Sequence, residues 1–236
     1  MSQWQEDLTD LVQNINCEKK LFQSIVPIVN KLGFEYCAYG IHLPIPISNP
    51  KVELINNYNS DWKESYHRNN YLLSDPSVAH CWSTSLPVVW TEDLFQFSRE
   101  MWEEARSHGL EHGWAQSSHG GNGISGMLTL SRSEDALTDN EIEKIGYRLS
   151  WLTHTLHTKM ATIFEKKHLS DINIKLTERE KSILRWTAEG KTAGETAQIL
   201  GITERTISFH IKNINAKLNS TNKVCSAVRA ALLGII

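Results

Sequence analysis

Residues 176–236 read LTEREKSILRWTAEGKTAGETAQILGITERTISFHIKNINAKLNSTNKVCSAVRAALLGII, and they predict four closely spaced helices. Two capping boxes, each a threonine followed three residues later by a glutamate, start helices at Thr177 and Thr192. Gly190 ends the first helix, and Gly201 makes a tight turn between the second and the third. A short helix, a glycine turn and a longer helix are typical of a helix-turn-helix, whose second helix enters the major groove of DNA.

The third of these helices, from Thr203 to Leu218, divides by its pitch into an apolar and a polar side. The side chains predicted to face the groove are Arg205, Ser208, Phe209, Lys212 and Asn213. The predicted phosphate contacts, which position a protein without reading sequence, are Lys191, His210 and Lys217, and Thr192 and Thr206 complete the predicted DNA-binding surface. Any one of these side chains alone is also compatible with a solvated helix face, whereas the whole pattern favours binding to double-stranded DNA.

This C-terminal stretch resembles the LuxR-type DNA-binding domain over its whole length. The positions that agree with that family's pattern are Thr177, Arg179, Glu180, Leu184, Gly190, Glu195, Ala197, Leu200, Ile202, Thr206, His210, Lys217, Leu218 and Ala227. Thr196 departs from it, because the family usually has an isoleucine at this packing position. The resemblance implies a transcription factor, but it does not identify the sensor, since the same module is attached to several kinds of domain.

The charge of the chain changes sign close to the start of this C-terminal stretch. Residues 172–236 hold 10 Lys and Arg against 5 Asp and Glu, whereas residues 1–171 hold 14 against 22. Seven of the eight tryptophans also lie in the larger, acidic part. A basic module joined to an acidic, tryptophan-rich one is the composition expected of a DNA-binding domain and a ligand-sensing domain. The four cysteines are scattered and the N-terminus is polar, which predicts a cytoplasmic protein. No apolar run is long enough for a membrane segment.

The N-terminal part alternates between helical and extended patterns, in the order helix, helix, strand, strand, helix, helix, strand, strand, helix. The predicted strands cover about residues 34–42, 51–56, 114–117 and 124–131. The last helix begins at a capping box, Thr138 to Glu141, and its apolar residues step by three and four from Ile142 to Ile163. That apolar face packs either on the sheet of its own domain or in a dimer interface, and the sequence favours neither.

These patterns predict an α+β protein. Its first part is an α/β/α sandwich with an antiparallel sheet over residues 1–165, followed by a linker over residues 166–174. Its second part is an all-α, four-helix helix-turn-helix domain over residues 175–236.

Residues 1–165 resemble the autoinducer-binding domain of acyl-homoserine-lactone receptors, the CepR branch in particular. The segments that carry the resemblance are LGFEYCAYG, NNYNSDWKESY, DPSVAH, PVVW, WEEARSHGL and WAQSS. The resemblance implies that the ligand is an N-acyl-homoserine lactone, and no cofactor is expected. Such a molecule needs one acceptor for its amide N–H, donors for its carbonyls and apolar walls for its tail.

The resemblance also assigns roles to individual side chains. It implies that Asp75 accepts the amide N–H, that Trp62 donates to the lactone carbonyl and that Tyr58 donates to the acyl carbonyl. The walls of the lactone and the first part of the tail would be Tyr66, Trp90, Phe95 and Trp102, with Thr129 as a second polar contact. Trp114 and Met127 are large enough to limit the tail, and its length does not follow from the sequence.

Two further patterns have simpler structural explanations. Gly121, Gly123 and Gly126 match a dinucleotide fingerprint, but an alternating strand follows them instead of the helix this site needs, so a hairpin turn is predicted. The pairs His108 with His112 and His154 with His157 have metal-ligand spacings but no carboxylate or thiol partner, so surface histidines are predicted. Neither a metal site nor a catalytic set of nucleophile and base is expected.

Three functions remain open. The first is a quorum-sensing regulator that responds to its lactone and binds an inverted-repeat operator as a homodimer, with RNA polymerase as the expected further partner. The second is a regulator of the same family that is independent of the ligand or inhibited by it. The third is an enzyme acting on a small lactone or amide. The first two share every residue named above.

Overall fold

The computed structural model describes residues 3–168 and 175–236, without the side chain of Asn122. The chain forms two compact units, one made mostly of residues before 164 and the other mostly of residues from 164 onward. Within the described ranges, no helix combines the length and the apolar character that a membrane span requires.

The first unit is built on a five-stranded antiparallel sheet with the strand order β2-β1-β5-β4-β3. Its strands are β1 (Tyr36–Leu43), β2 (Lys51–Asn56), β3 (Val88–Val89), β4 (His112–His119) and β5 (Ser125–Arg132). The sequence predicted four of them and missed β3, because a two-residue strand is too short for an alternating pattern. The hairpin prediction is confirmed, since the Gly121–Gly123 turn joins β4 directly to β5.

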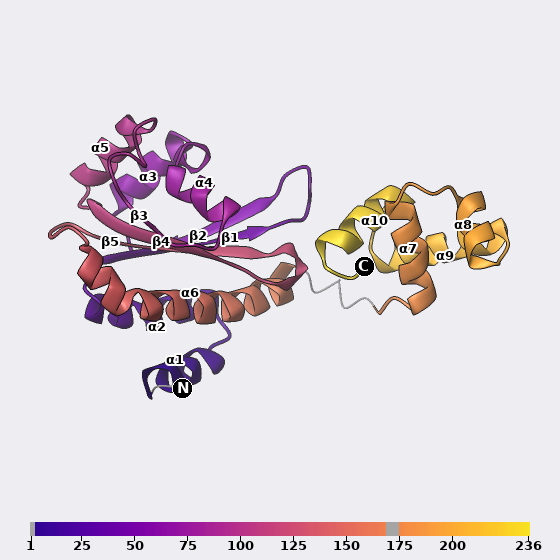
Figure 1. Cartoon of the computed structure of the whole chain (residues 1–236), viewed down its shortest axis with the longest axis horizontal. Helices are drawn as coiled ribbons and strands as arrows, with labels where there is room; N and C mark the ends of the chain where they lie inside the picture. The colour runs from indigo at the N-terminus through magenta and orange to yellow at the C-terminus, as the bar shows by residue number, and fades with distance from the viewer. Residues whose placement is uncertain (1–2, 169–174) are drawn as a thin grey trace. The chain divides into compact units, whose positions relative to one another are not determined.

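Helices cover both faces of this sheet (Figure 1). One face carries α2 (Glu18–Lys31) and α6 (Asp139–His168), and α1 (Gln3–Gln13) lies beyond them. The other face carries α3 (Ser60–Arg68), α4 (Pro76–Ser83) and α5 (Arg99–Ser107), with the short 3-10 helix η1 (Tyr71–Leu73) between the first two in the chain. The predicted α/β/α sandwich with an antiparallel sheet is confirmed.

The long helix α6 buries its predicted apolar stripe from Leu149 to Ile163, and it lies along one face of the sheet (Figure 1). The helix continues to His168, so residues 166–168 of the predicted linker are helical, and the rest of that linker lies outside the described residues. The predicted capping box at its start is half formed. Thr138 accepts from the Glu141 amide, but the Glu141 carboxylate binds the Arg132 guanidinium at 2.7 and 2.8 Å instead of capping the helix.

The prediction that His157 lies at the surface is wrong. Its ring is 1 % exposed, and Nδ1 shares a 2.8 Å hydrogen bond with the Tyr39 hydroxyl on β1. A side chain at Gly126 would come within 2.4 Å of both partners, so glycine is required on the strand beneath this pair. The sequence pattern failed here because a histidine surrounded by polar neighbours on a helix is indistinguishable from a solvated one until the facing strand is known.

The buried His157 predicts a stability that falls as the solution becomes acidic. Burial, together with the nearby His154 and His119, lowers the pKa of His157 to about 4. Below pH 6.5, the ordinary pKa of histidine, His157 is therefore protonated in the unfolded chain but stays neutral in the folded domain. We expect the unfolding free energy to drop by about 1.4 kcal/mol per pH unit between pH 6.5 and about pH 4 from this group.

Thermal unfolding of the full-length chain and of His157→Gln at pH 7.5, 6.5, 5.5 and 4.5 measures this slope. The difference between the two proteins isolates His157 from the carboxylates, and His67→Gln, at an exposed histidine on α3, is the matched control. Equal slopes for the unaltered chain and His157→Gln would contradict the assignment.

The second unit consists of α7 (Glu178–Ala188), α8 (Ala193–Leu200), α9 (Glu204–Lys217) and α10 (Lys223–Leu232). Both predicted capping boxes, at Thr177 and Thr192, are present with reciprocal hydrogen bonds. Gly201 adopts a left-handed conformation with φ of 65°, which makes the turn between α8 and α9. The core of this unit contains Ile183, Leu184, Ile207, Ile214, Leu218, Ala227 and Ala230. The predicted four-helix helix-turn-helix domain is confirmed.

Candidate ligand pocket and DNA-binding helix

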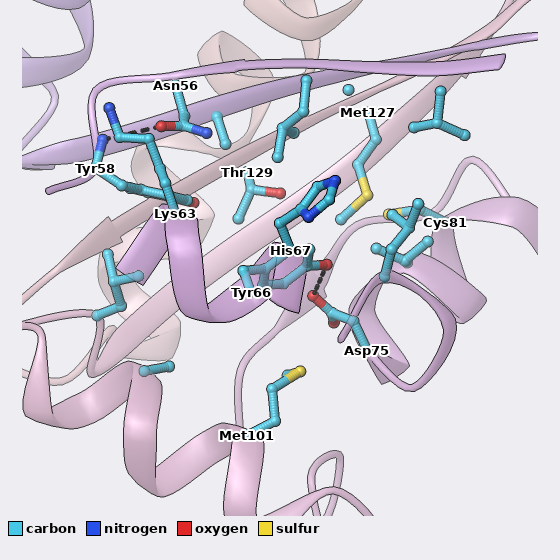
Figure 2. Close-up of a pocket in the computed structure, with 18 of the residues that line it drawn as sticks. Asn56, Tyr58, Lys63, Tyr66, His67, Asp75, Cys81, Met101, Met127 and Thr129 are labelled. Carbon is cyan, nitrogen blue, oxygen red and sulfur yellow. Dashed lines mark hydrogen bonds between the residues drawn. The ribbon is translucent and has the colours of Figure 1, made fainter. Parts of the chain in front are cut away.

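A cavity of about 530 Å³ lies in the first unit, on the face of the sheet that carries α3, α4 and α5 (Figure 2). This volume lies within the range of small-molecule sites in proteins. All eight residues predicted to contact a ligand line it: Tyr58, Trp62, Tyr66, Asp75, Trp90, Phe95, Trp102 and Thr129. They come from widely separated segments, and the fold brings them around the same space. Trp114, one of the two predicted limits of the tail, is fully buried elsewhere, whereas Met127 does line the cavity.

Asp75 is the carboxylate of this cavity, and the local sequence holds it there. It is the N-cap of α4, and Pro76 at the first helical position favours this start. Its Oδ1 accepts from the Ser77 amide at 2.9 Å and from the Ser77 hydroxyl at 2.6 Å. Its Oδ2 accepts from the Tyr66 hydroxyl at 3.1 Å, as Figure 2 shows. Burial raises the pKa of Asp75, and the hydrogen bonds from Ser77 and Tyr66 oppose that rise.

The aromatic residues form two packed groups around the cavity. Trp62 stacks on Tyr71 with ring centroids 5.9 Å apart and meets Tyr66 edge-on at 5.6 Å. Phe95 stacks on Trp102 at 4.2 Å, and Trp90 meets both rings edge-on at 5.7 Å. The buried indole Nε1 atoms of Trp90 and Trp102 find no hydrogen-bond acceptor among the described residues. The wall is therefore aromatic and mostly apolar, with buried indole donors that a polar ligand group could satisfy.

Two serines near this cavity were not predicted from the sequence as part of the site. Ser77 donates twice to Asp75, and Ser131 is fully buried next to Tyr58 on the strand that carries Thr129. The alternation of a strand could have revealed Ser131, because it lies two residues from Thr129 and therefore on the same face of β5.

Glu104 on α5 was also missed, and it holds the aromatic wall together. Its carboxylate accepts from the Ser65 hydroxyl of α3 and, at 2.7 Å, from the Tyr71 hydroxyl of η1. These hydrogen bonds lower the pKa of Glu104 and keep it ionised. No spacing in the sequence indicates this contact, because Glu104 lies more than thirty positions from both Ser65 and Tyr71 and meets them only in the folded domain.

The second unit presents α9 as its candidate DNA-reading helix. Arg205, Ser208, Phe209 and Lys212 are exposed on it, as predicted, and Asn213 is partly buried. Phe209 is 62 % exposed, although an aromatic ring in a monomeric protein is usually buried, and it lies edge-on to His210. The two threonines of the predicted surface have structural contacts. Thr192 caps α8, and the Thr206 hydroxyl meets that of Thr203 at 2.9 Å. Lys191 is partly exposed just before α8.

Lys217 has a different environment from the one its predicted phosphate contact requires. Its ammonium binds the Glu180 carboxylate at 2.7 and 2.9 Å, and the Glu180 side chain is only 4 % exposed. Burial alone would raise the pKa of Glu180, but hydrogen bonds from Lys217 and Thr177 outweigh burial and lower it. The pair ties the end of α9 to the start of α7, so a structural role explains Lys217 better than a phosphate contact.

Within the described part of the chain, no three His, Cys, Asp or Glu side chains are arranged to hold a metal ion. His108 ends α5, and its Nδ1 lies 3.2 Å from the Asn59 amide nitrogen, whereas His112 lies on β4. The fold and the two sites together define a class of protein in which a small-molecule sensor domain is attached to a helix-turn-helix domain.

Comparisons with known proteins agree with that class. An autoinducer binding domain matches residues 18–160, and a domain of the bacterial regulatory proteins of the luxR family matches residues 175–230. The chain is 45 % identical to the transcriptional activator protein AnoR of Acinetobacter nosocomialis, with all of both chains covered. It therefore belongs to the LuxR family of quorum-sensing transcriptional regulators.

Solved structures resemble the fold as well. The crystal structure of Escherichia coli SdiA has a TM-score of 0.84 and 30 % identity, and the match covers 99 % of this chain and 98 % of SdiA. The crystal structure of CepR2 from Burkholderia cenocepacia, described as an N-acylhomoserine lactone-dependent LuxR family transcription factor, has a TM-score of 0.62 and 26 % identity. That match covers 67 % of this chain and 94 % of CepR2.

Proposed function

We propose that this regulator binds an N-acyl-homoserine lactone in its N-terminal domain and, as a homodimer, an inverted-repeat operator through α9. The observation that carries the proposal is a cavity whose described lining places the Asp75 carboxylate against an aromatic wall, in the same chain as a helix-turn-helix. The lactone dependence stated for CepR2 supports the same ligand class. We place the ligand domain at residues 1–165 and the DNA-binding domain at residues 175–236.

The polar groups of the cavity match the polar groups of such a ligand. Oδ2 of Asp75 accepts one hydrogen bond, from Tyr66, so it has a lone pair for the amide N–H of the ligand. Trp62 donates to the lactone carbonyl and Tyr58 to the acyl carbonyl in this proposal. Tyr66, Trp90, Phe95 and Trp102 enclose the ring, and Thr129 supplies a further polar contact.

Ligand binding acts in this proposal by completing the core. Asp75 is a buried carboxylate, and the buried indole N–H groups of Trp90 and Trp102 find no acceptor among the described residues; both features cost stability. A ligand that satisfies them favours the folded domain, by about 2.7 kcal/mol at a hundred times its dissociation constant. The folded population available for dimerisation and for DNA then rises with ligand concentration.

The DNA contacts follow from the exposed face of α9. Arg205 and Lys212 are the charged donors for guanine or phosphate, while Ser208, Phe209 and Asn213 contact base edges. Lys191 and His210 contact the backbone. We infer a cytoplasmic regulator without catalytic activity or cofactor, with RNA polymerase as a partner at the promoter.

Fluorescence anisotropy tests the proposal directly. The full-length chain is titrated onto a labelled inverted-repeat operator at one salt concentration, with and without a panel of N-acyl-homoserine lactones. We expect affinity for the operator to rise with at least one lactone, and the lactone to be recovered intact. Strong binding without any lactone, or weaker binding in its presence, would assign the chain to the ligand-independent or ligand-inhibited regulators of the family. Turnover of the lactone would revive an enzymatic function.

Lys212→Ala is expected to weaken operator binding without changing the fold, because Lys212 is exposed on α9. Anisotropy at several salt concentrations should show lower affinity and a salt slope reduced by about one if the contact is to a phosphate. Lys223→Ala, outside the predicted DNA-binding surface, is the matched control. An unchanged affinity at fixed salt would refute the assignment of Lys212.

A further inference from the structure

The floor of the cavity is a regular strip of the sheet. Residues at alternate positions of β1, β2 and β5 line it, and the strand register pairs them into three successive rows. The rows are Asn56, Ala38 and Thr129; then Leu54, Gly40 and Met127; then Val52, His42 and Ser125. The outer rows are four residues apart along each strand, which is about 13 Å at ~3.3 Å per residue.

The polar head of the site lies at the first row. The Trp90 amide donates to the Gly113 carbonyl at 2.8 Å, and Gly113 pairs with Ser131, which lies beyond Thr129 on β5. Tyr58 lies next to the same Ser131. The donors and the aromatic wall therefore gather at one end of the strip, and the remaining two rows extend away from them.

Two rings lie at the far end of the strip. His42, in the third row, meets Trp82 edge-on, with ring centroids 6.0 Å apart, and both residues line the cavity. Trp82 lies near the end of α4, the helix that Asp75 caps. Seven residues of helix separate the two, about 10 Å at ~1.5 Å per residue. The span along α4 from Asp75 to Trp82 is thus similar to the span of the strip from its first to its third row.

We propose that this cavity selects lactones with unbranched acyl tails of about eight to twelve carbons, and that the His42–Trp82 pair sets the upper limit. The inference rests on the proposed function, since it concerns the tail of the same ligand. An extended alkyl chain advances ~1.3 Å per carbon–carbon bond, so 10 to 13 Å, as measured above, takes about eight to ten bonds beyond the head. Val78 and Met127 give this part of the cavity apolar walls.

Gly40 keeps the middle of the strip open. It lies in the second row and lines the cavity, and a Cβ added there meets the Leu54 side chain at 3.7 Å, an ordinary contact. A valine at this position is therefore compatible with the fold and favoured in a strand, yet it places a side chain in the path of the tail. Trp82 is 52 % exposed, so its removal opens the far end without emptying the core.

The test uses the full-length chain and straight-chain N-acyl-homoserine lactones with 4 to 14 acyl carbons. Dissociation constants are measured by intrinsic tryptophan fluorescence, with the thermal unfolding midpoint as a second readout. We expect the dissociation constant to fall about fourfold for each added methylene up to about eight to twelve carbons and then to rise. Tightest binding at four or six carbons would overturn the inference.

The variants show which residues set the limit. Gly40→Val should move the optimum to shorter tails by about two carbons or more, and Trp82→Ala should move it to longer tails. Phe97→Ala is the matched control, because Phe97 is an aromatic residue that is 93 % exposed and absent from the cavity lining. An optimum that neither variant moves overturns the inference while the proposed function stands. Failure of every lactone to bind the unaltered chain overturns the proposed function itself.

Discussion

Asp75→Asn should raise the lactone concentration needed for half-maximal operator binding by about 10- to 100-fold. A hydrogen bond to a charged acceptor contributes about 1.5–3 kcal/mol, and this substitution removes the charge that accepts the ligand amide. Asparagine caps a helix as well as aspartate does, so α4 should keep its start and its hydrogen bond from the Ser77 amide. The measurement is operator anisotropy titrated with the preferred lactone.

Two controls separate the binding role of Asp75 from a structural one. The thermal midpoint of the ligand-free variant should not fall, because the substitution removes a carboxylate whose pKa burial raises. Asp93→Asn changes an exposed carboxylate outside the cavity lining and should leave the response unaltered. An Asp75→Asn protein with the unaltered ligand response would show that Asp75 is only a helix cap.

Lys217→Met should lower the unfolding free energy of the DNA-binding domain by about 2–3 kcal/mol. It leaves the Glu180 carboxylate, 4 % exposed, without its cation. Breaking a fully buried pair costs about 3–5 kcal/mol, and a lower value is expected here because the Lys217 side chain is 37 % exposed and partly screened by water. Amide hydrogen exchange of α7 and α9 in the full-length chain should then accelerate about 30- to 150-fold.

A double substitution distinguishes this structural role from a phosphate contact. Adding Glu180→Gln removes the unpaired charge, so it should restore much of the lost protection. Lys212→Met, an exposed lysine on the same helix, should leave protection unchanged. If Lys217→Met instead retains full protection and lowers only operator affinity and its salt slope, Lys217 contacts phosphate as the sequence predicted.

The signals that start and end the helices and strands of this fold are local in the sequence, so the sequence predicted most of these elements. Capping threonines, glycine stops and apolar spacing operate over a few residues, so α7, α8 and α9 begin and end close to where they were expected. The same holds for β1, β2, β4 and β5, and Thr129 lies on β5 as expected. The exception is β3, two residues that form a strand only because β4 pairs with them.

The candidate site was recognised through the resemblance to a family and not through the spacing of its residues. Aromatic residues at such spacings are more often core than ligand contacts, and the resemblance singled out Tyr58, Trp62, Asp75 and Trp90. The structure places all four around one cavity, while their contacts with a ligand stay predictions. Ser77 and Glu104, which hold that arrangement, had no counterpart in the sequence analysis.

The sequence by itself determined the class of fold, the helix-turn-helix and the residue types available for each site, because short-range patterns and hydrophobic periodicity encode them. The tertiary structure alone decided which polar groups meet. It paired Lys217 with Glu180 across 37 residues and buried His157 against Tyr39 across 118. It also aligned the residues that form the floor of the cavity through the register of three strands. Such contacts depend on how distant segments pack, and a buried charge or imidazole is stable only where a partner from another segment reaches it.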